Sequence, residues 1–253
     1  MDINGVSAIV TGGASGLGAG TARVLSQAGA KVALFDVNTE LAEVTAGEIG
    51  GLAIGCDVTD EASTEAAIAR AREANGAARI LVNCAGVGTP AKAVGRNGPL
   101  ALERFTKVVA INLIGTFNVL RLAAADMIEL EPLNDGERGV IINTASVAAF
   151  DGQIGQPAYA ASKAGVAGMT LPLAREFAQH GIRVLTIAPG IFETPMLQGL
   201  DEKVQQALAA SIPFPNRLGT AAEYAGLVKH MCENMMLNGE VVRLDGAIRM
   251  APK

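Results

Sequence analysis

Short apolar runs alternate with longer amphipathic stretches along the chain, which is typical of strands that alternate with helices. Strands are predicted at residues 6–11, 31–36, 52–56, 80–83, 140–144, 182–188 and 241–244. Helices are predicted near residues 17–28, 39–49, 60–74, 100–130, 158–179 and 221–235. Each connection is long enough to return the chain parallel to the preceding strand. We therefore expect an α/β fold: one domain over residues 1–253, with a doubly wound seven-stranded parallel sheet and helices on both faces.

Three segments interrupt this alternation. The stretches 88–99 and 129–139 lack a strand or helix pattern and are interpreted as surface insertions. Residues 191–215 combine prolines with a partly helical pattern just before the last helix. Long connections of this kind often cover binding sites, so 191–215 is a candidate substrate lid.

Charge and cysteine content narrow the possible partners. The net charge of −5 with mixed signs gives no basic face for nucleic acid. Cys56, Cys84 and Cys232 are far apart and odd in number, so no disulfide framework and no metal site is expected. The apolar runs are too short to cross a bilayer, and no leader pattern opens the chain. We expect a cytoplasmic protein with a small-molecule substrate and no membrane partner.

A glycine-rich loop lies between the first predicted strand and the first predicted helix. It runs TGGASGLG from Thr11. Gly12 would permit the tight turn, Gly16 would let a pyrophosphate approach the backbone, and Gly18 would allow close packing of helix on strand. Elsewhere such a pattern could be an ordinary turn, but its strand–loop–helix context predicts a Rossmann-type dinucleotide site.

Asp36 ends the second predicted strand and favours NAD as the cofactor. A carboxylate there can accept hydrogen bonds from the ribose hydroxyls and would repel the 2′-phosphate of NADP. The adjoining Ser15 and Val37 supply no arginine that would attract that phosphate. Read in isolation, Asp36 could equally be a solvated acid at a strand end.

The third and fourth predicted strands end in residues that should line the same cofactor. Parallel strands bring their carboxyl ends to one edge of the sheet, where open α/β folds bind ligands. Cys84 is expected to contact the cofactor through its backbone and otherwise to be a small packed thiol. The predicted contacts at these strand ends are Asp57, Val58, Asn83, Cys84, Ala85 and Gly86.

Tyr159 and Lys163 form the predicted catalytic pair. Their i, i+4 spacing places phenol and ammonium on one face of a helix, and a nearby cation lowers the pKa of a phenol toward neutrality. Ser146, at the end of the fifth predicted strand, could hold and polarise the substrate oxygen. Asn112, an amide within a predicted helix, could hold water in a proton relay to Lys163.

Each of these features also has an ordinary structural explanation. A tyrosine and a lysine four apart occur by chance in many helices, and serine is common at strand ends as a turn former. His180 precedes Gly181 at a predicted helix end, where a histidine commonly complements the helix dipole. The combination with the glycine loop upstream is what favours catalysis.

Four motifs in this order resemble the short-chain dehydrogenase/reductase family: Thr11–Gly18, Asn83–Gly86, Tyr159–Lys163 and Pro189-Gly190. The resemblance implies a catalytic tetrad of Asn112, Ser146, Tyr159 and Lys163. It also implies that Thr194, after Pro189-Gly190, binds the nicotinamide carboxamide. Cys84 stands where the family usually has a second asparagine, while the surrounding turn is kept.

A closer resemblance is to the type II 3-hydroxyacyl-CoA dehydrogenases, also called type 10 17β-hydroxysteroid dehydrogenases. It rests on TGGASGLG, RGVIINTASVAAF, GMTLPLARE, RVLTIAPG, EYA and LNGEVVRLDGAIRM. It implies a homotetramer and a substrate contact at Gln156. Eukaryotic members lie in the mitochondrial matrix and can serve as partners in tRNA processing. The implied NAD contacts are Ser15, Leu17, Asp36, Asp57, Val58, Cys84, Tyr159, Lys163, Phe192 and Thr194.

The sequence therefore predicts NAD-dependent interconversion of a 3-hydroxyacyl-CoA, short-chain or 2-methyl-branched, and its 3-oxoacyl-CoA, with Tyr159 as acid–base. The alternatives are a 17β-hydroxysteroid or other apolar secondary-alcohol dehydrogenase and, in another class, an NAD-binding scaffold. Pocket walls are expected at Phe150, Gln153, Gln156, Met196, Leu197 and Phe214. Lys92, Arg96 and Lys203 are available for the phosphates of CoA, although each could be an ordinary surface charge.

Overall fold

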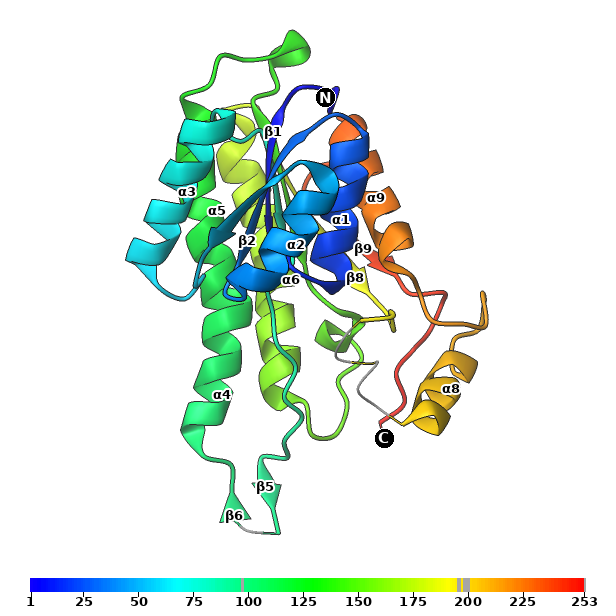
Figure 1. Ribbon diagram of the computed structural model, residues 1–253. Helices are drawn as coiled ribbons and strands as arrows, with labels where there is room; N and C mark the ends of the chain where they lie inside the picture. The colour runs from blue at the N-terminus through cyan, green and yellow to red at the C-terminus, as the bar shows by residue number, and fades with distance from the viewer. Residues whose placement is uncertain (97, 195–196, 198–200, 253) are drawn as a thin grey trace.

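The computed structural model describes residues 1–96, 98–194, 197 and 201–252. Its centre is a seven-stranded, fully parallel sheet with strand order β3-β2-β1-β4-β7-β8-β9 (Figure 1). The predicted doubly wound sheet is confirmed, and the strand bounds differ from the predicted ones by at most one residue. The strands are β1 (Ser7–Thr11), β2 (Lys31–Asp36), β3 (Leu52–Gly55), β4 (Ile80–Asn83), β7 (Gly139–Thr144), β8 (Ile182–Pro189) and β9 (Val241–Leu244).

Six helices cover the two faces of the sheet, as the apolar patterns predict. The helices α1 (Gly16–Gln27), α2 (Thr39–Ile49) and α9 (Ala221–Glu233) pack on one face, and α3 (Glu61–Asn75), α5 (Thr116–Ile128) and α6 (Pro157–Ala178) pack on the other. Successive strand residues alternate between these two cores, because neighbouring side chains of a strand point to opposite faces. In β1, for example, Ile9 joins one core while Ala8 and Val10 join the other.

The single helix predicted over 100–130 is wrong in detail. The structure has α4 (Leu102–Val109), a π-helical turn (Ala110–Gly115) and then α5. A π turn inserts one residue into the helical repeat, often at a functional site, and hydrophobic periodicity does not reveal it. The stretch Leu102–Ile128 is apolar enough by composition to span a membrane, but half of its most apolar window is buried in the fold, as a core helix would be.

The segments expected to be insertions acquire some structure. Residues 88–99 end in a small hairpin of β5 (Val94–Gly95) and β6 (Gly98–Pro99). The lid segment 191–215 contains α8 (Glu202–Ala210). The stretch 129–139 is not entirely a surface insertion, because Glu137 is buried and paired with Arg183 of β8 at 2.8 Å. A buried charge needs an opposite charge beside it, and no local pattern reveals a pair whose members lie 46 residues apart along the chain.

In the sheet, β2 and β3 lie on one side of β1, and β4 and the later strands lie on its other side. This reversal of strand order opens a crevice at the carboxyl edge of the sheet, where doubly wound folds bind ligands. The residues predicted to carry the chemistry follow the strands at this edge.

Candidate active site

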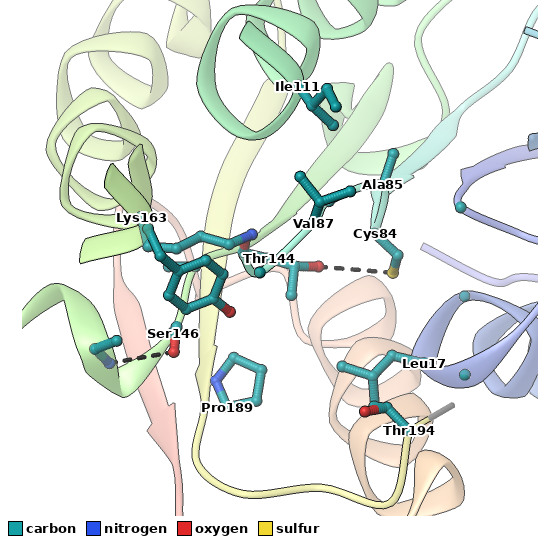
Figure 2. A pocket seen from close by; sticks show the side chains of 18 of the residues that line it. Leu17, Cys84, Ala85, Val87, Ile111, Thr144, Ser146, Lys163, Pro189 and Thr194 are labelled. Carbon is teal, nitrogen blue, oxygen red and sulfur yellow. Dashed lines mark hydrogen bonds between the residues drawn. The ribbon is translucent and has the colours of Figure 1, made fainter. Parts of the chain in front are cut away.

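A cavity of about 1160 Å³ runs along the carboxyl edge of the sheet from β2 across β1 and β4 to β7 and α6. In Figure 2, Lys163 and Ser146 lie at the left, Leu17 and Thr194 at the lower right, and Val87, Ala85 and Cys84 at the upper centre and upper right. The predicted residues that line this cavity are Gly12, Ser15, Gly16, Leu17, Gly18, Asp36, Asp57, Val58, Cys84, Ala85, Gly86, Ser146, Gln156, Tyr159, Lys163, Pro189, Gly190, Phe192 and Thr194.

The glycine loop has the geometry of a pyrophosphate cradle. Gly16 has a φ of +54°, and a Cβ on Gly18 would lie 2.1 Å from the carbonyl oxygen of Gly12, so the loop and helix α1 approach too closely for a side chain. Ser15 precedes α1 without making a side-chain capping bond, and the first turn of the helix carries no acid. The N-terminus of α1 therefore presents N–H groups to the cavity, as an anion requires.

Asp36, at the end of β2, is hydrogen-bonded to the glycine loop. Its Oδ2 accepts a hydrogen bond from the backbone N–H of Ala14 at 3.1 Å, and its Oδ1 accepts one from Asn38 at 2.9 Å. Each carboxylate oxygen can accept a further bond, as the hydroxyls of a ribose would need. Among the described residues, the basic groups that line the cavity are Lys107 and Lys163. The residues present fit NAD at this end.

The backbone after β4 is fixed by β1. The hydroxyl of Thr11 accepts hydrogen bonds from the N–H groups of Cys84 (3.2 Å) and Ala85 (3.1 Å), which line the cavity. Asn83, predicted to contact the cofactor, does not line it. Its buried amide donates to Asn143 Oδ1 at 2.9 Å and so joins β4 to β7. Because Asn83 is still within β4, its side chain stands on a face of the sheet opposite Asn143 and does not reach the open edge.

Tyr159 enters the cavity from the first turn of α6, where its hydroxyl meets Ser146. Ser146 follows β7, and its Oγ accepts the N–H of Ala148 at 3.1 Å at the start of a short 3₁₀ turn (Val147–Ala149) (Figure 2). Burial raises the pKa of Tyr159, and the hydrogen bond to Ser146 partly offsets this rise. The lowering by Lys163 expected from the sequence is not found in this site, because desolvation dominates.

Lys163 lies four residues further along α6, fully inside the protein. Its ammonium donates to the carbonyl oxygen of Thr144 at 2.7 Å and lies 5.8 Å from the centre of the Tyr159 ring. Burial lowers the pKa of Lys163 to about 8, since a cation loses its hydration there. Tyr159 therefore keeps its proton at neutral pH, whereas Lys163 stays mostly charged but loses its proton more readily than a lysine in water.

Asn112 is brought close to Lys163 but does not line the cavity. It lies in the π turn, where its Oδ1 accepts the N–H of Val87 at 2.8 Å and its Nδ2 donates to the carbonyl oxygen of Val87 and to Ser162 Oγ, each at 3.0 Å. Those three bonds use the amide group to fix the chain after β4. The water relay through Asn112 therefore stays a prediction, and its side chain is engaged in positioning.

A buried tyrosine that the sequence did not single out supports Thr144 from the other face of the sheet. The hydroxyl of Tyr224, from α9, lies 2.7 Å from Thr144 Oγ1 and 3.7 Å from Cys84 Sγ. Thr144 Oγ1 donates its own proton to the carbonyl oxygen of Asn83 at 2.6 Å, so Tyr224 must be the donor to Thr144. Burial raises the pKa of Tyr224 and of Cys84, so both keep their protons.

Replacing Tyr224 by phenylalanine should lower the free energy of unfolding by about 1–3 kcal/mol, since it removes one partner of a buried hydrogen bond. Urea unfolding followed by circular dichroism measures this change. Leu227→Ala, in the same helix, offers a comparison in which apolar contacts but no hydrogen bond are lost. An unchanged midpoint for Tyr224→Phe would show that the hydroxyl contributes nothing to the junction of α9 with the sheet.

The residues that line the substrate side of the cavity differ most from those predicted from the sequence. Gln156 and Leu197 line it as predicted, but Phe150 and Phe214 are 54% and 82% exposed and, with Gln153, lie outside the lining. Met196 lies outside the described residues. Aromatic type suggested pocket walls, but Phe150, directly after the 3₁₀ turn, and Phe214, in the segment after α8, both turn toward solvent.

Among the lining residues that the sequence did not reveal, Lys107 and Met250 bear most on the substrate side. Lys107 comes from α4, where a basic residue in a helix gives no signal of a site. Met250 comes from the end of the chain, whose position against the cavity depends entirely on tertiary contacts. The three basic residues considered available for the phosphates of CoA, Lys92, Arg96 and Lys203, do not line the cavity.

Comparisons with known proteins agree with this geometry. A family model described as short chain dehydrogenase matches residues 7–205. Two proteins named 3-hydroxyacyl-CoA dehydrogenase type-2 are similar to nearly the whole chain. The rat protein is 53% identical over 99% of this chain and 97% of its own length, and the Drosophila melanogaster protein is 54% identical over 98% and 99%.

A solved structure has the same fold. The crystal structure of 3-hydroxyacyl-CoA dehydrogenase type-2 from Mycobacterium avium superposes with a TM-score of 0.93 at 44% identity, covering 98% of both chains. The chain therefore shares its architecture with this protein over nearly its whole length.

Proposed function

Because the chain belongs to the short-chain dehydrogenase/reductase family, whose members are oxidoreductases acting on CH–OH groups, we propose that it oxidises 3-hydroxyacyl-CoA to 3-oxoacyl-CoA with NAD. The observation that carries this proposal is one cavity with Asp36 at its cofactor end and Ser146, Tyr159 and Lys163 at its other end. NAD would supply the hydride acceptor and, when oxidised, a positive charge beside these side chains.

The residues of the chain divide the proton chemistry between them. Ser146 Oγ accepts a backbone N–H and can donate its own proton to the substrate oxygen, which aims the alcohol at Tyr159. In its phenolate form, Tyr159 would take the alcohol proton while the hydride of the broken C–H bond leaves for the bound cofactor. Lys163, fixed through the Thr144 carbonyl, would hold the cofactor ribose, and its positive charge, together with that of oxidised NAD, would stabilise the phenolate.

Asp36 is the reason to propose NAD in place of NADP. Its carboxylate would bind the ribose hydroxyls and repel a 2′-phosphate, and Lys107 and Lys163 are the basic residues of the described cavity lining. Two like charges in one partly buried site would repel strongly, since a protein interior screens charge less than water does.

The acyl-CoA part of the proposal draws on the relatives' printed names and on the cavity walls. Ile191, Leu197 and Met250 give an apolar lining beside Gln156, which suits a short acyl chain next to a polar thioester. Lys92 lies beside the loop that leads to Gln156, because the neighbouring Ala91 N–H donates to the Gly155 carbonyl oxygen at 2.6 Å. It is available at the rim for a phosphate.

A ranking of substrates tests the proposed function. With NAD, kcat/KM should be highest for 3-hydroxybutyryl-CoA or 3-hydroxy-2-methylbutyryl-CoA and at least tenfold lower for a 17β-hydroxysteroid, because the site orients a thioester as well as the alcohol. The N-acetylcysteamine thioester of 3-hydroxybutyrate lacks the nucleotide and should show a raised KM.

Other outcomes would identify the alternatives. A preference for the steroid would favour a dehydrogenase of apolar secondary alcohols, which the same apolar lining could accommodate. NAD binding with no turnover of any alcohol or ketone would instead favour a non-catalytic NAD-binding scaffold.

A further inference from the structure

The last part of the chain, residues 245–252, forms a wall of the substrate pocket. We call it the C-terminal segment. It follows β9 and runs beside α8 in Figure 1, where it is drawn in red next to the gold helix. Met250 within it lines the same cavity as Gln156, Tyr159 and Leu197. The segment has no strand or helix of its own, so side-chain contacts must hold it.

An ion-pair network fixes one side of this segment. Arg243 of β9 binds Asp151 through both guanidinium nitrogens, at 2.6 and 3.3 Å, and binds Asp245 through Nε at 2.7 Å. The same guanidinium donates to the Ile248 carbonyl oxygen at 3.0 Å. Asp151 also accepts the N–H of Met250 at 3.4 Å. One arginine therefore joins the segment to the loop that follows Ser146.

Burial and charge make this network firmer than an ordinary surface pair. The side chains of Arg243 and Asp151 are only 22% and 15% exposed, so water screens the pair weakly. Hydrogen bonds from Arg243 lower the pKa of Asp151, and those to Asp151 and Asp245 raise the pKa of Arg243. Both partners stay charged across the neutral range, and two forked bonds fix the direction of the segment.

Two further contacts extend the attachment along the substrate loop, residues 151–156. Gln153 Nε2 donates to the Ala251 carbonyl oxygen at 2.9 Å, and the N–H of Ile154 donates to the Pro252 carbonyl oxygen at 3.0 Å. The loop continues to Gln156 and Tyr159. The position of Met250 is therefore tied to the loop that carries the acid–base group.

The other side of the segment is apolar and packs on the lid. Ile248 forms a buried cluster with Ile212 and Leu218, and Met250 packs against it together with Leu197, Leu208 and Ala209. Leu208 and Ala209 belong to α8, and Leu197 belongs to the lid segment. The C-terminal segment thus lies between the substrate loop and the lid and contacts both.

From this arrangement we infer that Met250 is a specificity-determining residue, whose side chain limits the length and branching of the carbon chain beyond the carbinol. The inference rests on the proposed function for the nature of the substrate. Methionine is flexible and apolar, so its side chain can adopt a rotamer that packs against a short acyl chain and still occupies the space that a longer chain would need. Asp151 and Arg243 are positioning residues that act through Met250.

Two variants of Met250 test this role. Met250→Ala should raise the ratio of kcat/KM for 3-hydroxyoctanoyl-CoA over 3-hydroxybutyryl-CoA roughly tenfold or more, the effect of one or two methylenes in an apolar pocket. Met250→Leu keeps nearly the same volume and should change the ratio less than threefold. NAD affinity, measured by calorimetry, should be the same in both variants and the wild type.

A variant of the network tests how Met250 is held. Asp151→Asn should raise KM for acyl-CoA about tenfold with kcat within a factor of three, and should speed hydrogen exchange of the amides at 246–251. Glu233→Gln is the matched control, since it breaks the exposed Lys229–Glu233 ion pair on α9, remote from the network. It should leave KM and exchange unchanged.

The results separate this inference from the proposed function. A wild-type enzyme that oxidises no 3-hydroxyacyl-CoA refutes the proposed function and leaves the exchange experiment as the test of the network. An active wild type whose chain-length ratio is the same in Met250→Ala refutes the role of Met250. Equal exchange in Asp151→Asn and Glu233→Gln refutes the positioning role of Asp151.

Discussion

Replacing Tyr159 by phenylalanine should lower kcat for alcohol oxidation by about 10³-fold or more, which is the scale of a lost general acid–base group. The phenyl ring keeps its place on α6, and only the hydroxyl that meets Ser146 is removed. NAD affinity should change less than threefold, because in the proposed function Asp36 and the glycine loop would hold the other end of the cofactor. Steady-state kinetics and calorimetric titration with NAD measure the two quantities.

The chain contains its own control for this experiment, since Tyr159 and Tyr224 are its two tyrosines. Tyr224→Phe removes the same atom from a site that does not line the cavity. It should cost stability but less than tenfold in kcat. Residual activity of Tyr159→Phe close to that of Tyr224→Phe would remove the phenol from the proposed chemistry.

Replacing Asp36 by alanine should lower kcat/KM with NAD by about 10²- to 10⁴-fold. Two hydrogen bonds from ribose hydroxyls to a charged carboxylate contribute about 1.5–3 kcal/mol each. Adding arginine at the exposed Val37 next to it should then reverse the preference, because a guanidinium can bind the 2′-phosphate of NADP in a forked geometry.

Asp36 also fixes the glycine loop through Ala14 and the start of α2 through Asn38, so its variants need a control for folding. Asp36→Asn keeps an oxygen acceptor but loses the charge, and it should fall between wild type and Asp36→Ala with NAD. Steady-state kinetics with NAD and with NADP measure the cofactor preference of each variant, and thermal unfolding shows whether the variant is folded. Continued preference of the double variant for NAD would mean that cofactor choice is set elsewhere in the cavity.

Local patterns predicted the sheet and the cofactor end of the site. The strand that ends at Thr11 and the loop through Gly18 are contiguous in sequence, and their chemistry follows from a turn and a helix N-terminus. Asp36 and Tyr159 occupy strand or helix ends that the fold brings to one edge. Such features depend on a few neighbouring residues, so a single sequence reveals them.

The substrate side could not be predicted in the same way. Met250 reaches the cavity because Arg243 binds Asp151, 92 residues away along the chain. Tyr224 supports Thr144 from across the sheet, 80 residues away. Pairings at this separation depend on the tertiary fold and leave no periodic signal. Phe150 and Phe214 show the opposite error, because residue type alone does not reveal the direction of a side chain in a loop.

The π turn at Ala110–Gly115 changes the rotational phase of α5 relative to α4. Each residue of an α-helix advances by about 100°, so the additional residue in this turn sets the two helices out of phase by about that angle. A helical wheel drawn through 102–128 without a break would assign residues after Gly115 to the wrong side. Deletions or grafts across this point must keep the extra residue if Asn112 is to go on facing Val87.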